Sequence, residues 1–218
     1  MHYFSRIFCA ILLCVSMTAA APAWAADDAA PTALHHEREV FAKEFAQLVV
    51  MILHEPKKSA NDRKNILRET FQASVDIDWI AKFVLGRSWK DATDEQRVRY
   101  TSLYKRYLTE TYVKNFAENP DKAIANIKVA GVSEDAENPF MVRTQMLLKD
   151  AENLNVDYRV SEEDGHYKIR DIAIENVSLI TTHRTEFGEL ASTEGVDGVI
   201  KRLETLLDNN SETILSMK

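Results

Sequence analysis

The feature of this sequence that most constrains its fold is a change in hydrophobic spacing at Pro120. Before it, apolar residues recur every three to four positions, which places them on one face of a helix. After it, Ile127 and Val129, and later Val156 and Tyr158, alternate with polar residues, as is typical of strands with one buried face. Helices, then strands, then helix again predict an α+β fold.

Four helices are predicted before this change. Their apolar faces indicate helices near 40–55, 66–71, 76–85 and 94–118. Pro56 ends the first, and Gly86 is placed to close the third, which is short and strongly apolar. Thr93 and Gln96 have the spacing of a capping box, in which each side chain bonds the backbone of the other residue. The fourth helix is therefore expected to begin there.

The strands are expected to form a mainly antiparallel sheet that curves. Asp164–Gly165 predicts a tight hairpin turn. The following strand begins with apolar residues two apart, but the count breaks near Arg170–Asp171, which indicates a β-bulge. We expect Val177, Leu179 and Ile180 to finish the sheet before the chain returns to helix.

The chain opens with the pattern of a secretory signal peptide. One positive charge at Arg6 is followed by an apolar stretch and by small residues that end in Ala25. Both cysteines, Cys9 and Cys14, lie in this segment, and the bulky Leu13 before Cys14 argues against a lipoprotein cleavage site. We therefore expect cleavage after Ala25 and a mature protein without cysteine, disulfide or lipid anchor.

The mature chain is expected to form one domain. The 193 residues left from 218 after cleavage of 25 suit a single core, which we place at 39–208. Small and polar residues predict a disordered stretch at 26–38, and 209–218 is expected to be a flexible C-terminus. The sequence contains no linker long enough to divide the domain.

Charge and hydropathy argue against several functions. Arg6 is the one charge in the signal segment, so 26 basic residues face 34 acidic ones in the mature chain, and its net charge is −8. Such a balance argues against nucleic-acid binding and against a basic membrane-surface patch. The longest apolar run after cleavage, Leu48–Leu53, is far shorter than the roughly 20 residues of a membrane-spanning helix.

No common catalytic motif is present. The sequence lacks a nucleophile elbow, a zinc-protease motif, a P-loop and a dinucleotide-binding motif. His35 and His36 fall in the predicted disordered stretch, where they could not hold a metal ion in place. His54 and His166 are expected to be exposed. No metal or cofactor is therefore expected.

His183 and Glu186 are the sharper candidates, because side chains at i and i+3 can share a helix face. They follow a strand, at a junction where polar groups commonly bond free backbone, and they lack a nucleophile and a third orienting group. Tyr104 or Tyr112 with Asp171 could serve an isomerase-like enzyme on a cone-shaped fold, although tyrosines at helical spacing are more often core. We expect no enzyme activity and keep the isomerase as an alternative.

Two stretches of the chain, 81–112 and 167–203, resemble the MlaC family of periplasmic phospholipid-binding proteins, also called the toluene-tolerance family. The matching elements are Phe83–Arg87, Trp89 with Ala92–Thr93, Val177–Leu179, Phe187 and Gly195–Gly198. The likeness extends more weakly over Val40–Leu207. Asn176 stands where the family has glycine, but Asn tolerates a left-handed backbone better than most residues.

The resemblance implies a curved sheet wrapped by helices around an apolar pocket that takes acyl chains. It implies a periplasmic carrier that moves phospholipid between the outer and inner membranes and so maintains the lipid asymmetry of the outer membrane. The implied partners are an inner-membrane ABC transporter complex with a lipid-binding domain and an outer-membrane lipoprotein complex. We expect a monomer that recognises the chains and, given its net charge of −8, leaves the headgroup in solvent. Another lipid, such as a hopanoid, is the alternative cargo.

The pocket is expected to be lined from both layers, although a plain adaptor with a filled core would show the same apolar pattern. The short helix at 76–85, which ends at Gly86 beside a polar turn that could act as a hinge, is the expected gate for lipid release. The inward residues nearest the family match are expected to contact acyl chains: Val84, Leu85, Tyr104, Leu108 and Tyr112 from the helices, and Val142, Met146, Val156, Tyr158, Ile169, Ile174, Val177 and Leu179 from the sheet.

Overall fold

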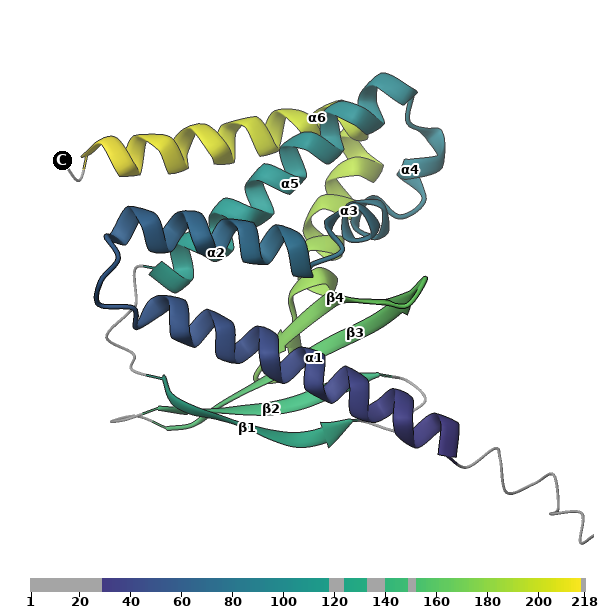
Figure 1. Cartoon of the computed structure of the whole chain (residues 1–218). Coiled ribbons are helices and arrows are strands. Elements are labelled where there is room, and N and C mark those ends of the chain that lie inside the picture. The colour runs from purple at the N-terminus through teal and green to yellow at the C-terminus, as the bar shows by residue number, and fades with distance from the viewer. Residues whose placement is uncertain (1–28, 118–123, 133–139, 149–151, 217–218) are drawn as a thin grey trace, which may run out of the picture.

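Helices precede and follow a five-stranded sheet (Figure 1). The computed structural model describes residues 29–117, 124–132, 140–148 and 152–216. Its helices are α1 (Ala29–Leu53), α2 (Ala60–Ser74), α3 (Ile77–Leu85), α4 (Ser88–Asp91), α5 (Asp94–Ala117) and α6 (Leu179–Ser216). Its strands are β1 (Ile124–Val132), β2 (Met141–Leu148), β3 (Leu154–Glu163), β4 (His166–Ile174) and β5 (Val177–Ser178). This order confirms the predicted α+β fold.

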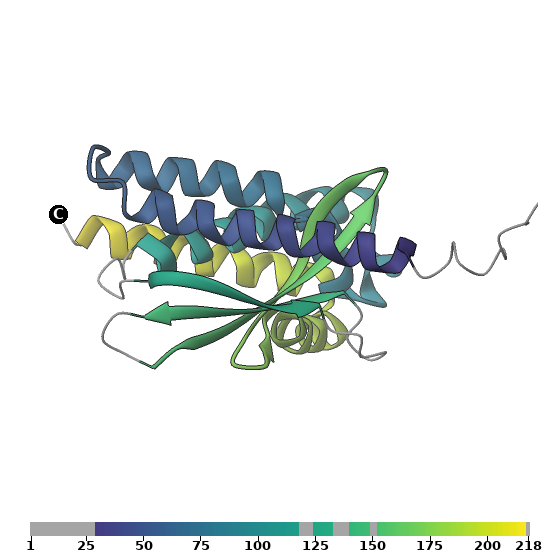
Figure 2. The ribbon, with the colours of Figure 1, turned by 60° about the horizontal axis from the view of Figure 1, so that its bottom comes forward.

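The sheet is an antiparallel meander, in which each strand pairs with the strand that follows it in the chain. Figure 2 shows the strands crossing and fanning out, so the sheet is strongly twisted. Asp164 and Gly165 join β3 to β4 with φ angles of 52° and 75°, which confirms the predicted tight turn. Asn176 has a φ of 65°, the left-handed conformation that its position in the β4–β5 turn requires.

A β-bulge interrupts the pairing of β3 with β4 at the predicted place. Arg159 pairs with Asp171, whereas the next residue, Val160, pairs with Ile169. Arg170 is therefore the extra residue on β4, and it bends the strand. Just before the bulge, Ile169 forms an isolated parallel bridge with Val75, which ties the link between α2 and α3 to the sheet.

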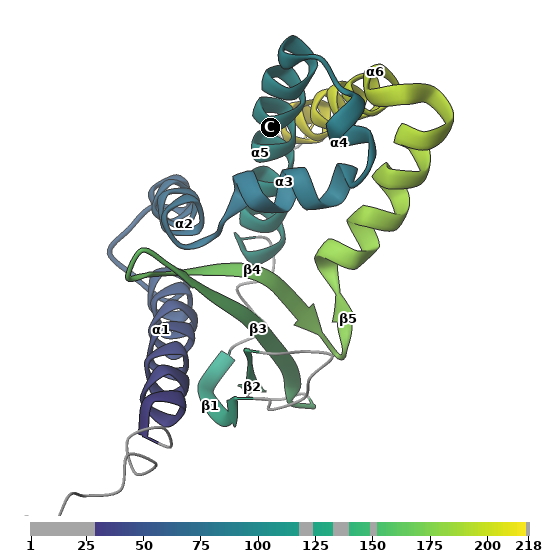
Figure 3. The ribbon, with the colours of Figure 1, turned by 90° about the vertical axis from the view of Figure 1, so that its right-hand side faces the viewer.

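The helices contact the sheet in two places. α1 packs along the strands and touches β1 to β4, while α2, α3 and α6 reach β4. Figure 3 shows α1 end-on beside the strands and α6 rising from β5, with α3 and α5 above β4. β4 is thus the strand at which α2, α3 and α6 meet the sheet.

Aromatic side chains fill the core between these layers. Phe45 of α1 meets Tyr158 of β3 edge to face, with ring centroids 5.9 Å apart. On the other side of the molecule Tyr100 and Tyr104 of α5 are completely buried. The Tyr100 hydroxyl donates a hydrogen bond to the carbonyl oxygen of Ala81, at 3.0 Å, which joins α5 to α3. The core is therefore specified by polar contacts as well as by shape.

Capping residues set several helix ends. The amide of Gln96 donates to Thr93 Oγ1 at 3.2 Å and the amide of Thr93 donates to Gln96 Oε1 at 3.0 Å, which confirms the predicted capping box of α5. Gly86 follows α3 with a φ of 57° and a ψ of −118°, a conformation that favours glycine. Gly195, with a φ of 72°, breaks α6 into two segments that point in different directions (Figure 3).

Helix α1 begins at Ala29, inside the stretch 26–38 that we expected to be disordered. Two contacts join the end of this stretch to the sheet side of the molecule. The Arg38 guanidinium is buried and lies 4.2 Å over the ring of Phe140, and the Tyr167 hydroxyl donates a hydrogen bond to Glu37. Both contacts join residues far apart in the sequence, so local composition gave no sign of them.

The C-terminal helix α6 continues to Ser216, across most of the segment 209–218. The expected flexibility of that segment stays a prediction. The expected signal peptide, with Cys9 and Cys14, lies outside the described residues. The extent of the single domain at 39–208 stays a prediction.

Strand β5 is shorter than predicted, because Leu179 and Ile180 begin α6 instead of finishing the sheet. The Ser178 hydroxyl accepts a hydrogen bond from the amide of Thr181 at 3.1 Å and so caps the helix. The apolar run through Leu179 and Ile180 concealed this boundary, since it suits a buried strand and the first turn of a buried helix equally well.

Candidate functional site

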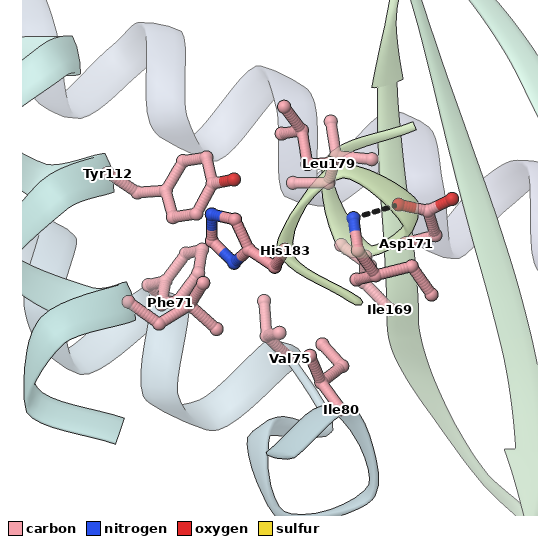
Figure 4. Close-up of a pocket in the computed structure, with 11 residues that line it drawn as sticks. Phe71, Val75, Ile80, Tyr112, Ile169, Asp171, Leu179 and His183 are labelled. Carbon is pink, nitrogen blue, oxygen red and sulfur yellow. Dashed lines mark hydrogen bonds between the residues drawn. The ribbon is translucent and has the colours of Figure 1, made fainter. Parts of the chain in front are cut away.

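An apolar cavity lies where the helical layer meets β4 (Figure 4). Its walls come from α2, α3, α5, β4 and the start of α6. The cavity volume is about 20 Å³, which is room for roughly one water molecule. Pockets that hold drug-sized ligands measure about 300–1,000 Å³, so this cavity is too small for an acyl chain in the present conformation.

Asp171 gives this apolar cavity a charged wall, although its side chain is only 2% exposed. Oδ2 accepts a hydrogen bond from the Ser178 hydroxyl at 2.6 Å, and Oδ1 accepts one from the Ile180 amide at 3.3 Å (dashed line in Figure 4). A buried carboxylate needs such donors to offset its lost hydration. Asp171 therefore fastens the junction of β5 and α6 to β4.

His183 and Tyr104 form a buried polar pair next to the cavity. Tyr104 Oη lies 2.9 Å from His183 Nδ1, and the imidazole tautomer decides which of the two donates. Burial lowers the pKa of His183, although the negative charges of Glu186 and Asp171 oppose this effect. Burial also raises the pKa of Tyr104 well above its ordinary value. Both groups are therefore neutral at neutral pH, which suits a structural hydrogen bond.

The candidate catalytic groups are engaged elsewhere. Glu186 Oε1 lies 3.8 Å from Arg202 Nη2, on the exposed side of α6. Tyr104 bonds His183, whereas Asp171 bonds the β5–α6 junction. Among the described residues, no hydrogen bond joins Asp171 to Tyr104 or His183. Tyr112 and Asp171 both line the apolar cavity, so this is the pair of the isomerase hypothesis that the structure brings to one site.

The structure brings together part of the predicted lipid site. Leu108 and Tyr112 of α5, Ile169 of β4 and Leu179 of α6 all line the cavity. Burial raises the pKa of the Tyr112 phenol, which keeps it protonated beside the imidazole of His183 (Figure 4). These residues come from both layers of the fold.

Other predicted site residues lie elsewhere. Val84 and Leu85 line a separate surface hollow beside Arg184 and Gly188. The inward residues of the sheet are core side chains that do not line the apolar cavity: Val142, Met146, Val156 and Tyr158. Ile174 is half-buried at the edge of this core.

The prediction that Val177 faces inward is wrong, because its side chain is 57% exposed. The short turn after Ile174 reverses the chain, and β5 is too short to carry the alternation of β4 onward. Whether any of the predicted residues contacts lipid stays a prediction.

The sequence reasoning missed several lining residues: Phe71, Val75, Ile80, Ile172 and Ile180, together with His183, which was weighed only as a catalytic group. Phe71 stacks on Tyr112 with ring centroids 5.3 Å apart, so α2 contributes a wall. Phe71 and Ile80 did stand on the apolar faces of predicted helices. Those apolar faces are the sequence signal that could identify the two residues.

A larger cleft of about 430 Å³ adjoins the apolar cavity. It shares Asp171 and Ile180 with that cavity and continues between Trp79, Phe83 and the bulge of β4. A third hollow of about 200 Å³ lies on the far side of Asp171, against Arg143 and Asp157. Asp171 is thus a wall common to three neighbouring hollows.

Within the described residues, no cluster of three or more His, Cys, Asp and Glu side chains could hold a metal ion. His54 and His166 are exposed, as predicted. The helices of the described segments include none that is long and apolar enough to cross a membrane.

Comparisons with known proteins agree with this architecture. A solved phospholipid-binding protein from Ralstonia solanacearum, determined in complex with a phospholipid, shares the fold with a TM-score of 0.64 at 22% sequence identity. The match covers 79% of this chain and 98% of that one. The family model described as MlaC protein matches residues 36–205, which is most of the sequence. The chain therefore belongs to the MlaC family.

Proposed function

We propose that this protein is a periplasmic carrier that buries the acyl chains of a phospholipid. The observation that carries the proposal is the apolar cavity between the helical layer and β4, in a chain of the MlaC family. The Ralstonia solanacearum protein of the same fold, which was solved with a phospholipid, supports the choice of cargo.

The physical requirement on such a carrier is strong. Exposure of the acyl chains of a diacyl lipid to water costs on the order of 20 kcal/mol of free energy, at about 0.8 kcal/mol for each of ~30 methylenes. Loose surface contact would leave most of that cost in place, so both chains have to be enclosed. The present cavity of about 20 Å³ is too small for an acyl chain, so loading requires its walls to move apart.

The proposed route runs between the two membranes of the cell envelope. An inner-membrane ABC transporter complex with a lipid-binding domain and an outer-membrane lipoprotein complex are the proposed partners, and transport between them would maintain outer-membrane lipid asymmetry. Release has to be triggered by docking, because each methylene exposed on the way out adds to the barrier. We propose that the carrier acts as a monomer and performs no chemistry on its cargo.

The test is to extract the purified mature protein with organic solvent and to identify the released molecules by mass spectrometry. Diacyl phospholipid in near-stoichiometric amount is expected. A matched pair of variants separates cavity binding from surface binding: Leu108→Trp fills the cavity wall, whereas Val98→Trp changes a residue that is 72% exposed on the same helix. Leu108→Trp should lose lipid, and Val98→Trp should retain it.

The other outcomes are informative. A hopanoid in the extract would show that the protein carries the alternative cargo. A small metabolite would favour the isomerase-like enzyme instead. An empty protein that remains folded, or equal lipid content in the two tryptophan variants, would contradict enclosure of chains in this cavity.

A further inference from the structure

The Tyr112 hydroxyl is a polar group on the wall of the apolar cavity. Tyr112 lines this cavity together with residues of α2, α3, β4 and α6, most of which are apolar. Figure 4 shows its ring reaching inward from α5, with the hydroxyl directed into the cavity. Phe71 of α2 stacks on this ring with centroids 5.3 Å apart, so a packed neighbour restrains the ring that carries the hydroxyl.

The Tyr112 hydroxyl makes no hydrogen bond to the residues that the structure describes. The other polar groups of the cavity wall do have partners. Nδ1 of His183 lies 2.9 Å from the Tyr104 hydroxyl, and both oxygens of Asp171 accept hydrogen bonds from the β5–α6 junction. Tyr112 is therefore the residue of this wall whose polar group can serve a ligand without breaking a contact of the fold.

This hydroxyl acts as a donor. Burial raises the pKa of the Tyr112 phenol, with smaller contributions in the same direction from Tyr107 and Asp171, so the group keeps its proton at neutral pH. A polar group without a partner in apolar surroundings is unfavourable, and an acceptor that enters the cavity would remove that penalty. The cavity is therefore suited to a molecule that is apolar except for one hydrogen-bond acceptor.

The charge of the cavity wall favours an uncharged acceptor. The described residues that line it include no lysine or arginine, and burial lowers the pKa of His183, which favours the neutral imidazole. Asp171 is the acid of this lining. An anionic phosphate group would meet the Asp171 carboxylate here without a compensating cation, whereas a carbonyl oxygen brings no charge into the cavity.

We propose that the Tyr112 hydroxyl donates a hydrogen bond to an ester carbonyl oxygen of the carried phospholipid. The inference rests on the proposed function and names the chemical group of the cargo that the cavity recognises. In a diacyl phospholipid the ester carbonyl is an uncharged acceptor attached directly to the acyl chain, so a chain that enters the cavity places this oxygen near the wall. Tyr112 thus selects lipids by the linkage of their chains and leaves the headgroup outside the cavity.

The experiment compares two phosphatidylcholines with chains of equal length, one with two ester linkages and one with two ether linkages, which lack the carbonyl oxygens. The lipid-free protein receives both lipids in equal amounts in micelles of an uncharged detergent, and mass spectrometry measures the bound ratio. The wild type is expected to prefer the ester lipid by about threefold to tenfold, the range of one hydrogen bond between neutral groups. In Tyr112→Phe, which keeps the aromatic ring, the ratio should fall to about one.

Tyr107→Phe is the matched control, because it removes a hydroxyl from the same helix at a position outside the lining of the cavity. Its bound ratio should equal that of the wild type. If Tyr112→Phe does not fold, Tyr112→Met provides the comparison, since methionine lacks the hydroxyl and adapts to irregular apolar space.

Infrared spectroscopy of the bound ester lipid, labelled with ¹³C at its ester carbons, reports on the hydrogen bond itself. A carbonyl group that accepts a hydrogen bond stretches at lower frequency, so a band of the wild-type complex should shift to higher frequency in Tyr112→Phe. Tyr107→Phe should leave this band in place.

Equal binding of the two lipids by the wild type overturns the inference, and so does a preference that Tyr112→Phe retains. A carbonyl band at the same frequency in the wild type and in Tyr112→Phe would show that the hydroxyl does not reach the ester, which also overturns it. A folded wild type that binds neither lipid would instead refute the proposed function itself.

Discussion

Asp76 joins the start of α3 to the bulge of β4, because its Oδ2 lies 2.8 Å from Nε of Arg170 while its Oδ1 accepts a hydrogen bond from the amide of Trp79. The Asp76 amide also donates to the Ile169 carbonyl oxygen at 2.9 Å. At the other end of α3, Arg184 donates a hydrogen bond to the Phe83 carbonyl oxygen. The helix that we expected to act as a gate is therefore tied to its neighbours at both ends.

Two substitutions of Asp76 separate its roles. Asp76→Ser keeps an oxygen that can cap α3 but loses the ion pair, whereas Asp76→Ala loses both. A cap contributes about 1 kcal/mol, so the alanine variant should be less stable than the serine variant by roughly that amount in urea unfolding. Asp94→Ala removes an ion pair whose carboxylate is 91% exposed. This variant should therefore lose less unfolding free energy than either Asp76 variant. Equal stability of the serine and alanine variants would show that Asp76 does not act as a cap.

If α3 is the gate, freeing its first turn should speed release. Asp76→Ala is expected to raise the rate at which bound phospholipid transfers to acceptor vesicles, measured with a fluorescent lipid, relative to Asp94→Ala. An unchanged rate in a variant that is clearly destabilised would exclude the N-terminal end of α3 as the moving part.

Removal of the Tyr104 hydroxyl should destabilise the fold more than removal of the Tyr112 hydroxyl. Tyr104→Phe leaves His183 Nδ1 buried without its partner, at a cost of about 1–3 kcal/mol. Tyr112→Phe changes a group that lines the cavity and should cost less. Thermal unfolding of both variants provides the comparison, and a larger loss for Tyr112→Phe would contradict the assignment of the polar pair.

His183 should make the protein less stable in mild acid. Burial lowers the pKa of His183 in the folded state, so the unfolded chain, with a pKa near 6.5, takes up this proton first as the pH falls. Well above pH 6.5, protonation of His183 therefore does not affect the free energy of unfolding. Below pH 6.5 it lowers this free energy, by at most about 1.4 kcal/mol at one pH unit below 6.5. His183→Gln should flatten the pH dependence of the unfolding free energy between about pH 7.5 and 5.5.

Gly86 should tolerate substitution poorly. A Cβ at this position would lie 3.0 Å from Arg184 Nη2, and φ is 57°. Gly165 has a φ of 75° but open space around it. Gly86→Ala should therefore lower the unfolding midpoint more than Gly165→Ala, since strain and crowding act together at the first position and strain acts alone at the second. The reverse order would mean that the Arg184 side chain moves aside without cost.

A photo-crosslinking residue should capture lipid at Leu108 but not at Arg106. Leu108 is 3% exposed and lines the cavity, whereas Arg106 is exposed on the same helix two positions away. Mass spectrometry of the irradiated, lipid-loaded protein detects the adduct. Similar labelling at both positions would indicate superficial binding.

The sequence predicted the layers and the bulge better than it predicted the site. The change of spacing at Pro120 and the break near Arg170 are properties of the local chain, so periodicity detects them. The lining of the cavity instead depends on which helix approaches β4. Phe71 enters the site because it stacks on Tyr112, and no local pattern records that contact.

The polar contacts were the hardest part to predict. Asp171 stood beside a predicted bulge, but its role follows from the return of the chain through Ser178 and Ile180, seven and nine residues later. Tyr104 and His183 are 79 residues apart in the sequence. Each of these pairs is fixed by tertiary structure, which spacing within one element cannot reveal.

The pairing of β1 has a consequence for behaviour at high concentration. β1 lies at the end of the strand order, so one of its sides could pair with the edge of another molecule. Its register with β2 shifts twice, between Ile124 and Asn126 and between Val129 and Gly131. Such irregularities twist an edge strand and break the flat row of donors and acceptors that aggregation requires. The same irregularity should keep the protein from forming intermolecular sheets when it is concentrated.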